Sequence, residues 1–305
     1  MGPVIHVSGC RKAYGSTVAV ADVSFDVLDG EIFGLIGPNG AGKTTTLECV
    51  EGLRRPDGGT ISVLGLDPIR DVYRLQERIG VQLQQAQLQK RIKVWEALDL
   101  WALLYGRTRI DGDRLLDQLG LTDKRNAWFM TLSGGQKQRL FIALALINDP
   151  DVVFLDELTT GLDPQARHAI WELVRGIRAR GKTVFLTTHL MEEAERLCDR
   201  VAIIDHGRIV DIDPPGRLVA RHCPERTVEL STAERGADER FREIGSVDSV
   251  SRDGERVTIR GRGDGFVTEV IQCVSEHRIR VADFRTMLPT LEDVFLKMTG
   301  HSIRD

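Results

Sequence analysis

The nine residues 37–45, GPNGAGKTT, constrain the fold of this chain more than any other stretch. An apolar segment, residues 31–36, precedes them, and a helical-looking segment, residues 45–52, follows. This is the strand, loop and helix context of a phosphate-binding P-loop. Small side chains let the N–H groups of the loop converge on an anion at the start of the next helix, where the helix dipole favours negative charge.

The P-loop pattern predicts specific contacts with a nucleotide. Lys43 would reach the β- and γ-phosphates, and the hydroxyl of Thr44 would hold Mg²⁺. A P-loop indicates a nucleotide but not the purpose it serves, which other motifs must supply. The predicted nucleotide contacts of this loop are Gly37, Pro38, Asn39, Gly40, Ala41, Gly42, Lys43, Thr44 and Thr45.

Composition narrows the class of protein. A length of 305 residues suggests about two domains, and 42% hydrophobic with 28% charged residues is typical of a soluble globular protein. The net charge of −4 gives no support to nucleic acid as the main partner. Five scattered cysteines without a C-x-x-C pair indicate reduced thiols in a cytosolic protein. No apolar stretch approaches 18 residues, so we expect the chain not to span a membrane by itself.

Two segments flank the P-loop in the expected fold. Residues 4–27 alternate in short β-like runs and predict a small antiparallel layer beside the loop. Tyr14 lies at a turn of this layer, where its ring could stack on a nucleotide base or serve only in packing. Residues 92–148 have a helical period and predict a helical insertion, with Trp101 and Tyr105 in an aromatic stripe that belongs to its core.

The pentapeptide LSGGQ, residues 132–136, is a second candidate anion site. Ser133 can cap the following helix, and the two glycines let its backbone approach a ligand closely. A simple helix cap would not need two glycines and a glutamine after the serine. The predicted ligand contacts of this motif are Ser133, Gly134, Gly135 and Gln136.

Two acidic residues follow a buried strand at residues 151–155. Successive side chains of a strand point to opposite faces, so Asp156 and Glu157 should do different work. Asp156 would hold Mg²⁺, and Glu157 would orient or deprotonate the attacking water. His189 ends the next apolar strand and could either polarise the nucleophile or have a structural role. A zinc protease is rejected because the second histidine of that motif is missing.

Beyond about residue 221 the pattern starts again. Short strands and helices there predict a small α+β domain that could have a ferredoxin-like arrangement. The domain shows no catalytic cluster, and we interpret it as a regulatory or dimerising accessory. The predicted fold class is therefore α/β, a P-loop NTPase (RecA-like) core with an antiparallel β layer and a helical subdomain at about 90–150. The expected domains are residues 1–220 and 221–305.

With these motifs in this order, residues 4–220 resemble an ABC transporter ATP-binding subunit. The resemblance implies that Tyr14 stacks on adenine and that His189 is the switch histidine. It implies that Gln84, one of several glutamines in this segment, senses Mg²⁺ and water and faces the membrane partner. It also implies that residues 160–163, ending in Asp163, form the loop that crosses the dimer interface.

In this family two subunits enclose two ATP molecules, and the P-loop of one subunit faces the LSGGQ of the other. ATP binding then closes the dimer and hydrolysis reopens it. This chain has one copy of each motif, so we expect a homodimer that uses ATP and Mg²⁺. Two residues depart from the family pattern: Leu158 replaces a usual proline and Lys93 a usual threonine. Neither change removes a predicted phosphate or metal contact.

The tail of the chain, residues 288–300, is similar to the tails of drug-export ATPases of the daunorubicin-resistance type. This resemblance implies export of a drug, antibiotic or lipid-like compound by a separate membrane-spanning permease, with the ATPase at the cytoplasmic face of the membrane. One alternative is a soluble ABC ATPase acting on ribosomes or DNA, but those usually have two cassettes or a long coiled-coil insertion. A nucleotide-binding regulator without turnover is a third hypothesis, which Glu157 and His189 argue against.

Overall fold

A computed structural model describes residues 2–82, 87–107 and 110–300 of the chain. Its contacts divide the chain into two compact units, one that ends at Pro215 and one that begins at Gly216. This boundary lies just before the one predicted at residues 220 and 221. Each unit has its own sheet and its own hydrophobic core.

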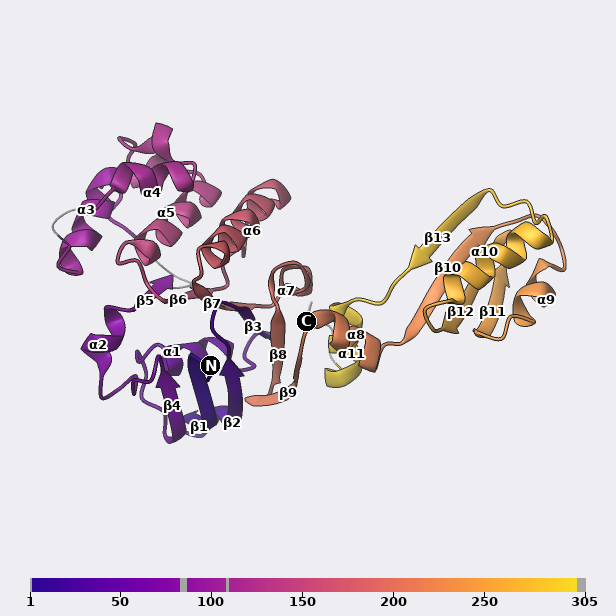
Figure 1. Ribbon diagram of the computed structural model, residues 1–305, viewed down its shortest axis with the longest axis horizontal. Helices are drawn as coiled ribbons and strands as arrows, with labels where there is room; N and C mark the ends of the chain where they lie inside the picture. Colours follow the sequence, from indigo (N-terminus) through magenta and orange to yellow (C-terminus); the bar gives the residue numbers. More distant parts are fainter. Residues whose placement is uncertain (1, 83–86, 108–109, 301–305) are drawn as a thin grey trace. The chain divides into compact units, whose positions relative to one another are not determined.

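A parallel sheet forms the centre of the N-terminal unit (Figure 1). Its three central strands are buried along their whole length, which fits sequences that are rich in apolar residues and do not alternate with charged ones. Strand β9 (Arg208–Asp213) extends the sheet as an antiparallel partner of β8. In spatial order the parallel strands are β8 (Arg200–Asp205), β3 (Ile32–Ile36), β7 (Thr183–Thr188), β6 (Val152–Asp156) and β5 (Ile79–Gln82).

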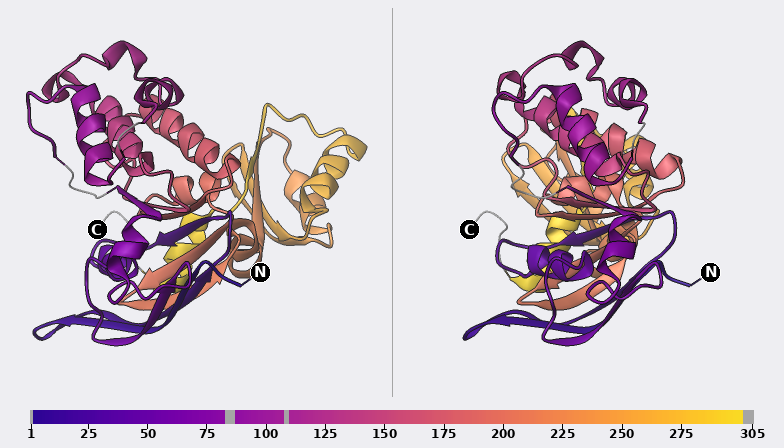
Figure 2. Two further views of the ribbon diagram at one scale, coloured as in Figure 1. Left: turned by 60° about the vertical axis from the view of Figure 1, so that its left-hand side comes forward. Right: turned by 90° about the vertical axis from the view of Figure 1, so that its left-hand side faces the viewer.

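An antiparallel layer joins the parallel strands through β9, as the sequence predicts. Its hairpin turns at Gly15, where a positive φ of 59° suits a residue without a side chain. Figure 2 shows this layer as the long indigo strands below the helices of the unit. The strands are β4 (Gly58–Val63), β1 (Ile5–Tyr14) and β2 (Thr17–Val27).

Four phenylalanines fasten the antiparallel layer to the parallel strands. Phe25 of β2 stacks on Phe33 of β3 with ring centroids 5.3 Å apart, and both rings lie 5.6 Å from Phe185 of β7. Phe154 of β6 lies 5.9 Å from Phe185. These rings belong to one buried cluster, so the antiparallel layer packs on one face of the strand that leads into the P-loop.

Seven helices accompany the sheet within the described part of the N-terminal unit. They are α1 (Lys43–Val50), α2 (Val72–Gln76), α3 (Val94–Leu104), α4 (Gly112–Gln118), α5 (Gly134–Leu146), α6 (Pro164–Ala179) and α7 (Met191–Leu197). Two 3₁₀ turns, Thr122–Lys124 and Phe129–Thr131, lie between α4 and α5. Helices α3, α4 and α5 lie together in Figure 1 and form the helical insertion predicted for residues 92–148.

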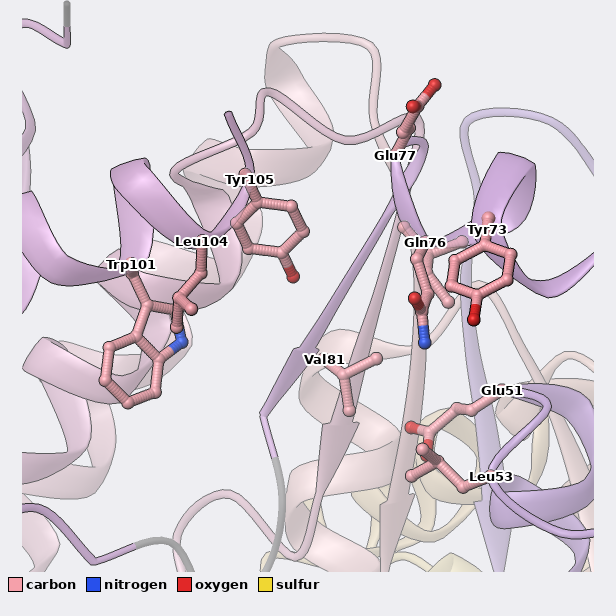
Figure 3. A pocket seen from close by; sticks show the side chains of 10 residues that line it. Glu51, Leu53, Tyr73, Gln76, Glu77, Val81, Trp101, Leu104 and Tyr105 are labelled. Atoms are coloured by element: carbon pink, nitrogen blue, oxygen red, sulfur yellow. The ribbon is translucent and has the colours of Figure 1, made fainter. Parts of the chain in front are cut away.

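The helical insertion differs from the prediction at the end of α3. Val94 and Leu98 are buried there as expected. Trp101 and Tyr105, predicted to be core residues, are only half-buried and line an open groove. The helical period correctly identified the apolar face of α3. It does not show that the C-terminal end of this face lacks a covering element and lines a groove (Figure 3).

The C-terminal unit contains a four-stranded antiparallel sheet in the order β11, β12, β10, β13. With α9 and α10 between strands, this is the βαββαβ order of a ferredoxin-like fold. The last strand begins at Asp283 and ends at Met287. The elements are α8 (Pro215–His222), β10 (Glu225–Ser231), α9 (Ala237–Arg242), β11 (Val247–Asp253), β12 (Arg256–Arg262), α10 (Phe266–Glu276), β13 (Asp283–Met287) and α11 (Leu291–Thr299).

None of the helices in the described ranges is long and apolar enough to cross a bilayer.

Candidate nucleotide-binding site

The P-loop connects the end of β3 to the start of α1, as its sequence predicts. Two of its glycines are required by close backbone approach. A Cβ on Gly37 would lie 2.3 Å from the carbonyl oxygen of Ile204, and a Cβ on Gly42 would lie 2.3 Å from that of Ala19. Gly42 also has a φ of 102° as the N-cap of α1. Asn39 and Gly40 lie at the exposed tip of the loop.

Lys43 lies inside the loop, with 4% of its surface exposed. Its Nζ donates to the carbonyl oxygens of Gly37 at 2.9 Å and Pro38 at 3.0 Å. The same Nζ lies 3.7 Å from Oε1 of Glu157. Burial lowers the pKa of Lys43, while the negative charges of Glu157 and Asp156 raise it. The ammonium thus links the P-loop to the residues that follow β6.

The two acids at the end of β6 have different partners. Buried Asp156 accepts a hydrogen bond from the hydroxyl of Thr187 on β7. Burial raises the pKa of Asp156, and the hydroxyls of Thr187 and Thr44 lower it. Asp156 therefore lies between the first turn of α1 and β7, beside Thr44, the other residue predicted to hold a metal ion.

Glu157 contacts a histidine and a lysine. Its Oε1 lies 3.4 Å from Nδ1 of His189 and 3.7 Å from Nζ of Lys43. The contact with His189 is the main cause that lowers the pKa of Glu157, and Lys43 acts in the same direction against the effect of burial. Glu157 is also one of the few non-glycine residues with a positive φ, 46°. The structure therefore brings together Lys43, Glu157 and His189 from three separate segments.

The oxygen donors beside the P-loop fit a hard divalent cation. Mg²⁺ prefers oxygen ligands and usually retains water or phosphate oxygens rather than taking all its ligands from protein. Thr44 and Asp156 supply such oxygens. In the described ranges no group of three or more His, Cys, Asp or Glu residues could hold a metal.

The LSGGQ residues lie at the start of α5, in the helical insertion. Ser133 and Gln136 form a reciprocal capping box: the side chain of Ser133 accepts from the N–H of Gln136 at 3.3 Å, and the side chain of Gln136 accepts from the N–H of Ser133 at 2.9 Å. Ser133 and Gly134 are exposed. Gly135 is buried, and a Cβ there would lie 3.1 Å from the side chain of Ala166 on α6. The motif thus presents a preformed helix start.

The other predicted residues that the structure describes lie on separate elements of the N-terminal unit. Asp163 caps α6, and its side chain accepts from the N–H of Ala166 at 2.9 Å. Tyr14 ends β1 with 42% of its surface exposed, and the guanidinium of Arg54 lies 5.2 Å from its ring centre. Thr45 lies in the first turn of α1. Gln84 falls outside the described residues, so its predicted role stays a prediction.

The two departures from the family pattern have local explanations. Leu158 is buried, with 2% of its surface exposed. Lys93 is the N-cap of α3, where its N–H donates to Glu96 at 2.8 Å. Leu158 is thus packed in the interior, and Lys93 is held by a hydrogen bond to Glu96.

Sequence reasoning missed two residues that organise this region. Thr187 binds Asp156 through its hydroxyl and contacts the N–H of Glu157 at 3.2 Å. Glu193 is 1% exposed, and its Oε1 accepts from the hydroxyl of Thr159 at 2.8 Å and from the indole N–H of Trp171 at 3.0 Å. Thr187 lies on β7 and Glu193 on α7, and neither residue is part of a recognised sequence motif. An acidic residue four positions after His189, on a short amphipathic helix, was the only available signal for Glu193.

We expect Glu193→Ala to destabilise the N-terminal unit by about 2–4 kcal/mol, because two buried donors would lose a charged acceptor. Thermal and urea unfolding of the full chain would measure the change. Glu192→Ala is the matched control, because Glu192 is exposed and its ion pair with Arg196 contributes about 1 kcal/mol or less. Equal stability of the two variants would contradict the role given to Glu193.

Comparison with known proteins supplies the family. The ABC transporter family model matches residues 20–160. A Nod factor export ATP-binding protein I of Ralstonia nicotianae is 40% identical, over 99% of this chain and 96% of that protein. The protein of the same name from Paraburkholderia xenovorans is 41% identical, over 99% of this chain and 98% of that protein.

Solved structures of ABC transporter proteins also match this chain. The ATP-binding subunit of an ABC transporter matches 72% of this chain and 92% of its own, with 30% identity and a TM-score of 0.65. A bacterial ABC transporter cassette solved as a dimer matches 69% of this chain and 98% of its own, with 26% identity and a TM-score of 0.61. This chain therefore belongs to the family of ABC transporter ATP-binding proteins and is an ATPase.

Proposed function

We propose that this chain powers export through a separate membrane-spanning subunit by forming a homodimer around two ATP molecules. The observation that supports this most directly is the cluster of Lys43, Glu157 and His189, with Asp156 and Thr44 beside it. It combines a cation for phosphate, oxygen donors for Mg²⁺ and an acid that a histidine keeps ionised. These are the groups that phosphoryl transfer to water needs.

Each residue has a proposed role in that reaction. Backbone N–H groups of residues 37–42 and Lys43 would bind the phosphates, and Tyr14 would stack on adenine. Thr44, Asp156 and Gln84 would hold Mg²⁺, which lowers the repulsion between phosphate and an incoming nucleophile. Glu157 would orient or deprotonate the attacking water, because a carboxylate with a lowered pKa is ionised at neutral pH. His189 would hold Glu157 in position.

A second copy of the chain would complete each site. Ser133 and Gly134 are exposed at the start of α5, so the free N–H groups of that helix can meet a phosphate of another subunit. Asp163 caps the start of the neighbouring helix α6, consistent with a role near a subunit interface. The dimeric cassette with 26% identity supports this arrangement.

The proposed direction of transport is export. The relatives named above are described as Nod factor export proteins, and they match this chain along nearly its full length. Together with the tail of daunorubicin-resistance type, they support export of a drug, antibiotic or lipid-like compound. The ATPase would act at the cytoplasmic face of the membrane, with residues 221–305 as an accessory domain of regulatory or dimerising function.

We predict that Glu157→Gln binds ATP but nearly abolishes its hydrolysis, because the amide cannot act as a base while the phosphate contacts remain. Gel filtration with light scattering should then show a dimer in ATP and a monomer without it. Lys43→Ala is the control, since it should lose ATP affinity and give no dimer. Unchanged turnover in Glu157→Gln would contradict the role of Glu157.

The membrane partner has its own test. Affinity purification of the tagged full chain from detergent-solubilised membranes should recover a polytopic membrane protein, identified by mass spectrometry. Recovery of ribosomes or DNA in its place would support the soluble alternative and refute the transport role. The variants Glu157→Gln and Lys43→Ala can be used both in the hydrolysis assay and in this purification.

A further inference from the structure

Glu193 on α7 is a buried acid that lies four residues after His189. With 1% of its surface exposed, it can touch neither the solvent nor a bound nucleotide. Among the described residues its Oε1 receives two neutral donors, and its Oε2 has no hydrogen-bond partner. A carboxylate in such surroundings costs free energy that an apolar side chain would not, which points to a role beyond packing.

The two donors to Glu193 come from different elements. The hydroxyl of Thr159, which is itself buried, donates at 2.8 Å from the loop that follows β6. The indole N–H of Trp171 donates at 3.0 Å from α6, the helix that follows this loop and contacts α7 (Figure 1). One carboxylate oxygen therefore joins α7 both to the loop and to the next helix.

The loop that Thr159 belongs to begins with a strained residue. Glu157, two positions before Thr159, has a φ of 46°, and such a conformation persists only where neighbouring groups hold it. On one side its N–H donates to the carbonyl oxygen of Thr187 at 3.1 Å. On the other side its carbonyl oxygen accepts from the N–H of Thr160 at 3.3 Å, and Thr159 ties this turn to α7.

The same helix is tied to His189. Helix α7 begins at Met191, two residues after His189, and the N–H of Glu193 donates to the carbonyl oxygen of Leu190 at 3.1 Å. Glu193 thus lies in the first turn of α7. The Thr159 bond therefore links the segment of Glu157 to the segment of His189, whose side chains lie 3.4 Å apart.

We propose that Glu193 is a positioning residue for ATP hydrolysis, which acts by holding Thr159 and thereby keeps Glu157 at a fixed place relative to His189. The proposal rests on the role proposed above for Glu157. It assigns different work to the two donors: the bond from Thr159 reaches the loop of Glu157, whereas the bond from Trp171 reaches only α6.

The first test measures ATP hydrolysis by the full chain over a range of ATP concentrations. Thr159→Val removes the hydroxyl and keeps the shape of the side chain, so kcat should fall about tenfold or more because a displaced catalytic group is costly. KM for ATP should stay near the wild-type value, because the P-loop contacts are untouched. Thr159→Ser keeps the hydroxyl and should restore kcat. A wild-type kcat in Thr159→Val overturns the proposal.

Two further variants separate positioning from stability. Trp171→Phe removes the other donor together with buried bulk, so it should melt at a lower temperature than Thr159→Val and yet keep a kcat near that of the wild type. Equal losses of kcat in the two variants would overturn the proposal, since kcat would then follow stability. Thr159→Ala also lacks the hydroxyl and takes the place of Thr159→Val if that variant does not fold.

The last arm does not depend on activity. Hydrogen–deuterium exchange of the full chain without nucleotide, read by mass spectrometry, should be faster over residues 157–163 in Thr159→Val than in the wild type or Thr159→Ser. Equal exchange in all three overturns the tether. If Glu157→Gln retains turnover, the role of Glu157 fails and the positioning role with it, while the exchange of residues 157–163 still decides whether Thr159 holds the loop.

Discussion

The buried ammonium of Lys43 is the interaction on which the arrangement of this site depends. A charge with 4% exposure is costly unless it is paired and hydrogen-bonded. Two carbonyl groups of the P-loop and the carboxylate of Glu157 meet that requirement. The loop is thereby held against the end of β6, and this places Thr44 beside Asp156 and Glu157 beside His189.

Much of this arrangement follows from the sequence because its motifs lie at the carboxyl ends of parallel strands. The P-loop after β3, the acids after β6 and His189 after β7 meet at one edge of the sheet, where α/β proteins bind ligands. The antiparallel layer and the helical insertion are likewise visible as changes of hydrophobic period. Motif spacing and strand polarity therefore suffice to predict the cluster, although not its distances.

Tertiary contacts set the limit of sequence reasoning. In the sequence, Thr187 looks like any other strand residue. Only the register of β6 and β7 shows that it lies opposite Asp156. In the sequence, Glu193 looks like a solvent-exposed helix residue. In the structure it accepts hydrogen bonds from the side chains of Thr159 and Trp171. Trp101 and Tyr105 were wrongly predicted to be core, because periodicity identifies the apolar face of a helix but not what covers that face.

The central claim is that one chain supplies only half of each ATP site, with Lys43 on one side and Ser133 on the other. Mixing two inactive variants, Lys43→Ala and Ser133→Arg, tests it most directly through the rate of ATP hydrolysis. The account predicts that the mixture hydrolyses ATP faster than either variant alone, because a mixed dimer contains one site with an intact P-loop and an intact LSGGQ. A rate no greater than the mean of the two separate variants, with mixed dimers demonstrated in the same sample, would contradict it.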